Sequence, residues 1–212
     1  MNPLLIHRIR VKVCGITRPE DGLAAAMLGV DAIGLVFYRS SPRFVDALTA
    51  KRIMEILPPF VTTVGLFVNA AVAEVHDIMR QVPLDLLQFH GDEAPDYCVA
   101  FGRPFIKAVP MNIESDVADY ARRFKMAAGL LLDSHGGGKT GGSGQRFDWT
   151  AIPAGVDKPI ILAGGLNSDN VAEAIHQVQP FGVDVSSGVE SAKGVKDHEL
   201  MRLFMRRIDH DV

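Results

Sequence analysis

Two reactive side chains stand where short apolar runs of the chain end. Cys14 closes the run that begins at Val11, and Asp133 closes the run that begins at Gly129. If both runs are strands of one parallel sheet, the thiol and the carboxyl project from its carboxyl edge, where sheets and barrels of this kind place their chemistry. A thiol and a carboxyl that face one substrate suit paired base and acid catalysis.

Each of these residues also has a structural interpretation. A strand cysteine often serves as a small buried apolar residue, and an aspartate at a strand end often caps a turn. Base catalysis by Cys14 requires thiolate character from a cationic or helix-terminal neighbour. Acid catalysis by Asp133 requires burial that keeps the carboxyl protonated near neutral pH. The residues themselves leave both interpretations open.

Three other polar residues are candidates for contacting a substrate. Arg43 follows the second apolar run, and its planar guanidinium group suits a carboxylate. His90 and Asp184 lie near the ends of the fourth and eighth runs, where substrate contact and local hydrogen bonding are equally good explanations. Seven histidines without H-x-H or H-E-x-x-H spacing give no metal site.

Glycines and serines follow the last two apolar runs. Glycine lets a phosphate approach the backbone, and exposed N–H groups favour the anion. Because the loops after strands seven and eight are the frequent phosphate site of (β/α)8 barrels, these residues predict a phosphorylated substrate. The predicted phosphate-binding residues are Gly164, Gly165, Ser186, Ser187 and Gly188.

The segment 134–144 resembles two nucleotide-binding motifs without matching either. Gly136, Gly138 and Gly141 fit G-x-G-x-x-G, but no helix is expected to open there. The P-loop pattern fails because Asp133 occupies the position of its first glycine. A loop this rich in glycine is costly to order, so the segment is expected to be either a lid over the substrate or a disordered connection. His135 has no assigned role.

Apolar runs alternate with helical patterns along the whole chain, which favours a single parallel, eight-stranded (β/α)8 TIM barrel over a doubly wound sheet. Asp46 and Ser168 are expected N-caps, Pro19 an expected first helical residue, and residues 1–10 a short extension before the barrel. The predicted strands are 11–16, 32–37, 62–68, 86–90, 105–109, 129–133, 159–163 and 182–186, and the predicted helices are 19–28, 47–57, 72–81, 95–101, 115–124, 168–178 and 198–208, with a weak one at 149–152.

Composition limits the class of protein. The chain of 212 residues has 48% hydrophobic and 22% charged residues, enough for one substantial core. A net charge of −3 gives no footprint for nucleic acid or an anionic membrane but allows a local pocket for a small anion. Cys14 and Cys98 form no disulfide or zinc framework. The absence of a signal peptide or long apolar segment predicts a cytoplasmic protein.

Several ordered segments resemble the phosphoribosylanthranilate isomerase family of tryptophan biosynthesis. Together, in this order and spacing, they are highly specific and cover nearly the whole chain after about residue 10. The segments are Lys12–Thr17, Gly34–Tyr38 with Ser41–Arg43, Gly65–Asn69, Leu87–Gly91, Gly141–Gly144 with Phe147–Trp149, Ala163–Leu166 and Val183–Glu190.

The resemblance implies an Amadori rearrangement of N-(5-phosphoribosyl)anthranilate to a 1-deoxyribulose 5-phosphate that carries the 2-carboxyphenylamino group. Asp133 resembles the general acid and Cys14 the general base, while Arg43 resembles the group that holds the anthranilate carboxylate. No cofactor and no metal is implied. Alternatives are another sugar-phosphate barrel, such as a pentose-phosphate epimerase or an indole-glycerol-phosphate-forming lyase, or a non-catalytic phosphate-binding module. The oligomeric state and a second activity on a histidine-pathway aminoaldose stay open.

Overall fold

Eight parallel strands form a closed barrel. The computed structural model describes residues 8–111, 116–134 and 147–210. Within them the strands pair in sequence order and β8 pairs with β1, so the predicted eight-stranded barrel is confirmed. The strands are β1 (Arg10–Cys14), β2 (Ala32–Val36), β3 (Thr62–Phe67), β4 (Leu86–Phe89), β5 (Phe105–Pro110), β6 (Gly129–Asp133), β7 (Ile160–Leu162) and β8 (Gly182–Val185).

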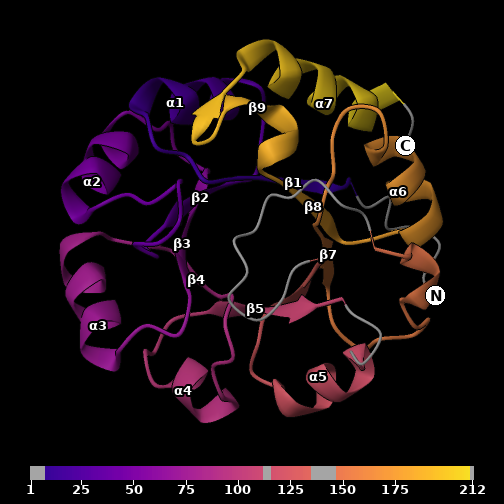
Figure 1. Cartoon of the computed structure of the whole chain (residues 1–212), viewed down its shortest axis with the longest axis horizontal. Coiled ribbons are helices and arrows are strands. Elements are labelled where there is room, and N and C mark those ends of the chain that lie inside the picture. Colours follow the sequence, from indigo (N-terminus) through magenta and orange to yellow (C-terminus); the bar gives the residue numbers. More distant parts are fainter. Residues whose placement is uncertain (1–7, 112–115, 135–146, 211–212) are drawn as a thin grey trace.

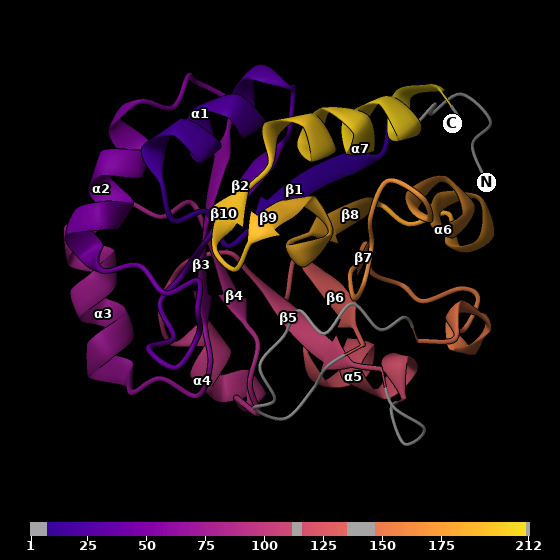
Figure 2. The ribbon, with the colours of Figure 1, turned by 45° about the horizontal axis from the view of Figure 1, so that its top comes forward.

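Helices surround the barrel in sequence order (Figure 1). The last helix lies beside the first, which completes the ring (Figure 2). Between β6 and β7, a short 3-10 helix, η1 (Trp149–Ala151), occupies the place of the weakly predicted helix. The helices are α1 (Pro19–Met27), α2 (Ala47–Glu55), α3 (Val72–Gln81), α4 (Pro95–Val99), α5 (Val117–Arg123), α6 (Val171–Val178) and α7 (His198–His210).

Most predicted helix starts are confirmed, but α5 begins at Val117, not at residue 115, and the predicted start of α6 is also wrong. Pro19 is the first residue of α1, and the Asp46 carboxylate accepts a hydrogen bond from the Thr49 backbone N–H at the start of α2. Ser168 is not the cap of α6, because α6 begins three residues later, after Asn170. The intervening residues form a turn, in which the Asn170 side chain accepts a hydrogen bond from the Asn167 N–H.

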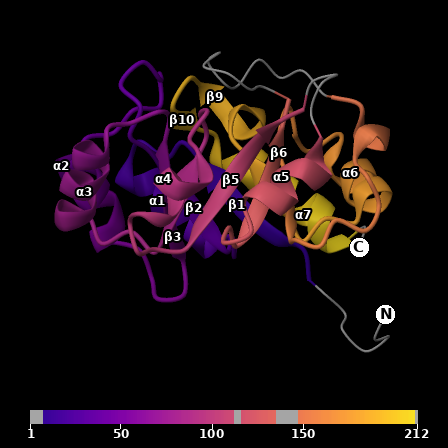
Figure 3. The same ribbon diagram turned by 90° about the horizontal axis from the view of Figure 1, so that it is seen from below.

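A small hairpin beyond β8 was not predicted. A 3-10 turn, η2 (Ser187–Val189), leads into β9 (Glu190–Ala192) and β10 (Val195–Lys196), which pair antiparallel. Seen from the side, the hairpin lies at one end of the barrel (Figure 3). The predicted N-terminal extension is one residue too long, because Arg10 already pairs with Gly182 as part of β1.

Alternation along each strand separates the core into two parts. Successive strand residues face opposite sides of the sheet. In β1, Val11 and Val13 therefore belong to the large cluster packed beneath the helices, whereas Lys12 and Cys14 face the barrel interior. The two polar or reactive side chains of this part of β1, Lys12 and Cys14, therefore lie on the inward face of the strand.

Candidate active site

Cys14 lies at the carboxyl end of β1 and is buried, with 6% of its surface exposed. Its side chain packs with Val36 and Leu66 of the next two strands inside the barrel. Gly34 makes room for the sulfur, since a Cβ atom at position 34 would lie 2.7 Å from Sγ. The absence of a side chain on β2 therefore sets how far the thiol reaches into the barrel.

His90 and Asp133 meet across the interior. The Nε2 atom of His90, one residue beyond β4, lies 3.2 Å from Oδ2 of Asp133, the last residue of β6. Strand β5 separates β4 from β6, so these side chains reach each other over its inner face. The pair brings two of the predicted site residues together at the carboxyl end of the barrel.

The backbone around His90 is held by a buried lysine. Lys107 of β5 donates hydrogen bonds from Nζ to the carbonyl oxygens of Phe89, at 3.2 Å, and Gly91, at 2.5 Å. The same ammonium group lies 3.1 Å from the Glu93 carboxylate, which accepts hydrogen bonds from the backbone N–H groups of Asn69 and Gly91. The imidazole consequently projects from a rigid loop.

Asp184 interacts electrostatically with both Cys14 and Asp133. Its carboxylate lies 2.7 Å from Lys12 Nζ, and both side chains are buried. Lys12 is also a hydrogen-bond partner of the Cys14 thiol. Burial raises the pKa of that thiol, and the positive charge of Lys12 offsets this only in part.

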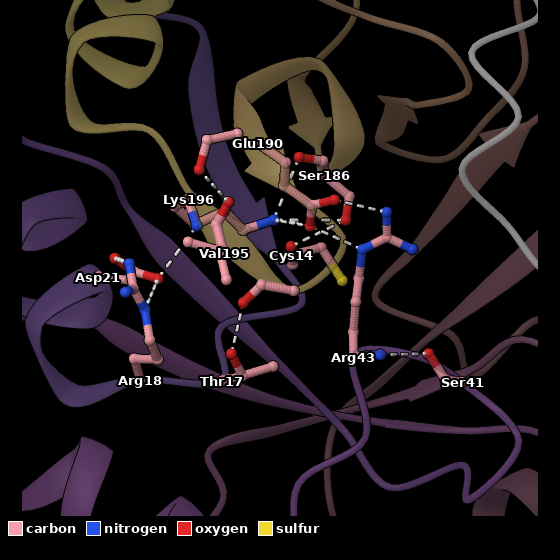
Figure 4. Close-up of polar contacts among 12 residues, drawn as sticks. Cys14, Thr17, Arg18, Asp21, Ser41, Arg43, Ser186, Glu190, Val195 and Lys196 are labelled. Carbon is pink, nitrogen blue, oxygen red and sulfur yellow. Dashed lines mark hydrogen bonds and ion pairs between the residues drawn. The ribbon is translucent and has the colours of Figure 1, made fainter.

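Arg43 belongs to a buried charge cluster that also contains Glu190 and Lys196 (Figure 4). Its Nε and Nη2 atoms each lie 2.7 Å from a Glu190 carboxylate oxygen, a bidentate pair. Lys196 Nζ lies 2.8 Å from the same carboxylate and 3.1 Å from the carbonyl oxygen of Ser186. Burial opposes ionisation of Glu190, but the two cations hold its pKa below the usual value.

Close packing brings Arg43 next to the carboxyl end of β1. Gly15 follows Cys14 with a φ of +76°, and a Cβ atom there would overlap the Arg43 side chain. The positive charge of Arg43 and a negative charge on the Cys14 sulfur would stabilise each other. Two cationic side chains, Arg43 and Lys196, thus meet beside the Cys14 strand, and cationic side chains suit an anionic group of a ligand.

The predicted phosphate loops lie together at the same end. Gly164 and Gly165 follow β7 with φ of +81° and +73°. A Cβ atom at Gly164 would lie 2.5 Å from the Ser134 backbone nitrogen, and one at Gly188 would overlap the Leu166 carbonyl oxygen. Ser186, beside Ser187 of η2, donates a hydrogen bond from Oγ to the Cys14 carbonyl oxygen at 3.0 Å.

The sequence interpretation missed several polar residues of this site: Lys12, Gln88, Lys107, Glu190 and Lys196. Period-two spacing was the available signal for two of them, because Lys12 and Gln88 precede Cys14 and His90 by two residues and so share their face.

The remaining predictions, on His135 and the glycine-rich stretch 136–144, fall outside the described residues. In the part of the chain that the structure describes, no group of three or more His, Cys, Asp or Glu side chains is arranged to hold a metal, and no helix is long and apolar enough to cross a membrane.

A closed parallel barrel with a buried thiol, a histidine–carboxyl contact, a charge cluster and glycine-rich loops at one end has the architecture of a (β/α)8-barrel enzyme. The family model for N-(5'phosphoribosyl)anthranilate (PRA) isomerase matches residues 11–207. The chain belongs to this family and is an isomerase of tryptophan biosynthesis.

Similar proteins agree over nearly the full length. The N-(5'-phosphoribosyl)anthranilate isomerase of Pseudomonas fluorescens (strain SBW25) is 56% identical over 200 residues, which cover 94% of this chain and 95% of that protein. The crystal structure of phosphoribosyl anthranilate isomerase from Thermotoga maritima is 41% identical, with a TM-score of 0.86, covering 95% of this chain and 98% of that one. A further crystal structure of phosphoribosyl anthranilate isomerase, in complex with reduced 1-(o-carboxyphenylamino)-1-deoxyribulose 5-phosphate, is 38% identical with a TM-score of 0.83 and the same coverage.

Proposed function

We propose that this chain converts N-(5-phosphoribosyl)anthranilate into 1-(2-carboxyphenylamino)-1-deoxyribulose 5-phosphate by general acid and base catalysis. The observation that carries the proposal is the position of Cys14 and Asp133 on the inner face of β1 and β6, with Asp184 in electrostatic contact with both. A related isomerase in complex with a reduced form of this product supports the choice of substrate.

Asp133 acts first, as the acid. It donates a proton to the ring oxygen of the ribose, the bond between that oxygen and C1 breaks, and the nitrogen lone pair forms a protonated Schiff base with C1. Asp133 is left as a carboxylate. His90 Nε2, 3.2 Å from its Oδ2 atom, is placed to stabilise that charge by a hydrogen bond.

Cys14 acts second, as the base. The thiolate removes the proton from C2, and the electron pair of that C–H bond forms a C1–C2 double bond and neutralises the nitrogen. The resulting enolamine tautomerises to the ketone. Lys12 and Lys196 both act electrostatically on the thiol in the direction that favours the thiolate, against the effect of burial.

The two charged ends of the substrate are held apart from the reacting carbons. The phosphate binds the backbone of Gly164, Gly165 and the turn Ser186–Gly188. The anthranilate carboxylate binds the cluster of Arg43, Glu190 and Lys196, where Glu190 fixes the plane of the Arg43 guanidinium group through Nε and Nη2. Holding both ends fixes C1 and C2 between the acid and the base.

The test follows substrate consumption by anthranilate-type fluorescence, with freshly made N-(5-phosphoribosyl)anthranilate and metal-stripped protein. Wild type should turn it over, and Asp133→Asn should lose about 10²- to 10⁴-fold in kcat, the usual contribution of one positioned acid. Product affinity should be largely kept, since the amide retains the shape of the carboxyl.

Two results would count against the proposal in different ways. Near-native turnover by Asp133→Asn would remove Asp133 from the mechanism. If neither protein consumed the compound, N-(5-phosphoribosyl)anthranilate would not be the substrate, and a phosphate-binding module without catalysis would fit better. We infer in addition that the barrel is one domain and works in the cytoplasm, where its pathway substrate would be made.

A further inference from the structure

Gln88 is a fully buried polar residue beside the acid side of the site. It lies in β4, two residues before His90, and faces the same side of the strand. Its side-chain Nε2 lies 2.9 Å from Nδ1 of His90. Its other polar atom, Oε1, is buried and has no hydrogen-bond partner within the described part of the chain.

The chemistry of the amide fixes the direction of this contact. An amide NH2 group can donate but not accept a hydrogen bond, so Nδ1 of His90 must be the acceptor. The proton of the neutral imidazole is then on Nε2, which faces Oδ2 of Asp133 at 3.2 Å. One amide orientation thus sets the direction of two consecutive hydrogen bonds.

We propose that Gln88 is a positioning residue that selects the Nε2–H tautomer of His90 and thereby keeps Oδ2 of Asp133 an acceptor. The proton that Asp133 gives to the substrate is then carried by Oδ1, which also lies 3.4 Å from the Ser134 hydroxyl oxygen. This inference rests on the proposed role of Asp133 as the acid and deepens it by assigning its two oxygen atoms different tasks.

Packing alone does not explain Gln88. Leaving a buried carbonyl oxygen without a donor costs free energy, which a Leu or Met of similar size would avoid. Gln88 is also not needed to place the His90 backbone. The His90 N–H donates to the Phe67 carbonyl oxygen, and Lys107 holds the carbonyl groups of Phe89 and Gly91 on either side. What Gln88 adds is the orientation and tautomer of the ring.

The primary test is 15N NMR of histidine-labelled protein, with the His90 signals assigned by their loss in His90→Asn. Wild type should show the Nε2–H tautomer of His90 at a pH where the ring is neutral. Gln88→Glu replaces the donor by an acceptor and should move a proton onto Nδ1. Gln88→Met should leave the tautomer unselected, with averaged signals. A wild-type spectrum of the Nδ1–H tautomer would overturn the proposal even if neither variant folds.

Kinetics provide the second readout. Loss of one hydrogen bond that orients the acid should lower kcat in Gln88→Met roughly three- to tenfold, with KM little changed. Ile106→Val, at another buried inward position, controls for loosened packing. Equal losses in both variants would reduce Gln88 to a packing residue. The tautomer is read without turnover, so a wild type that fails to consume the substrate would contradict the proposed function and leave the tautomer assignment standing.

Discussion

At the residue scale, burial and charge act on the Cys14 thiol in opposite directions. Burial raises its pKa above the usual value of 9.0, whereas Lys12 and, more weakly, Lys196 lower it. Burial prevails, so the thiol is protonated at neutral pH in the unbound enzyme. A base that is protonated in the unbound enzyme must lose its proton as the pH rises or when substrate binds. The dependence of the Cys14 thiolate on pH can be measured directly.

We expect the alkylation rate of Cys14 by iodoacetamide, followed by mass spectrometry in a Cys98→Ala background, to keep rising above pH 9.0. The reason is that the thiolate is the nucleophile and exists only above the pKa of the thiol. A free thiol titrated in parallel is the control, and a plateau for Cys14 below pH 9.0 would contradict the raised pKa.

At the element scale, the loop between β4 and α4 depends on an ion pair rather than on apolar packing. The side chains of Lys107 and Glu93 are each 2% exposed. Glu93 accepts hydrogen bonds from the backbone N–H groups of Asn69 and Gly91, and Lys107 donates one to the Gly91 carbonyl oxygen. A buried pair of this kind costs desolvation energy, and removing one partner leaves an uncompensated charge. The loop carries His90, so its rigidity matters for the acid side of the site.

Lys107→Met is therefore expected to lower the free energy of unfolding by about 3–5 kcal/mol, measured by urea denaturation. The double variant Lys107→Met/Glu93→Gln should lose less than the single variant, because no buried charge remains without a partner. If the two variants were equally unstable, the loss would come from the broken backbone hydrogen bonds and not from the stranded carboxylate.

At the scale of the whole molecule, the barrel depends on the pairing of its first and last strands. Arg10 and Gly182 form the first register pair between β1 and β8. A Cβ atom at position 182 would lie 2.8 Å from the Arg10 carbonyl oxygen, closer than real contacts allow. Beyond β8, the hairpin of β9 and β10 attaches to the barrel through Lys196, whose N–H donates to Asp21 of α1. Closure thus places β1 beside β8, so that Lys12 of β1 meets Asp184 of β8.

Gly182→Ala should lower the free energy of unfolding by about 1–3 kcal/mol, because the added methyl group must push β1 and β8 apart. Differential scanning calorimetry or urea denaturation measures this. Gly22→Ala in α1 is the matched control: its Cβ would meet a side-chain methyl group of Ile53 at 3.1 Å, and the gain in helix propensity offsets the contact. A Gly182→Ala variant as stable as Gly22→Ala would show that the strands adjust without cost.

Sequence reasoning predicted the regular elements well and the polar interior poorly. Apolar runs and helix starts such as Pro19 and Asp46 depend on neighbours within a few residues, and these are in the sequence. The hairpin after β8 was missed because its strands have three residues and two residues, and one of them carries the buried Lys196. The cap of α6 was misplaced because Ser168 lies in the turn before the helix, and the sequence pattern does not show that this turn continues to Asn170.

The barrel, the strand ends that carry Cys14 and Asp133, and the family could all be predicted from the amino-acid sequence, because they follow from local pattern and from the order of motifs. Which side chains meet was decided only by the tertiary structure. His90 reaches Asp133 across β5, Lys12 pairs with Asp184 over the closing seam, and Arg43 finds Glu190, 147 positions away. These contacts depend on closure of the sheet and on the alternation of side chains along each strand, because both bring residues far apart in the sequence to one face of the barrel.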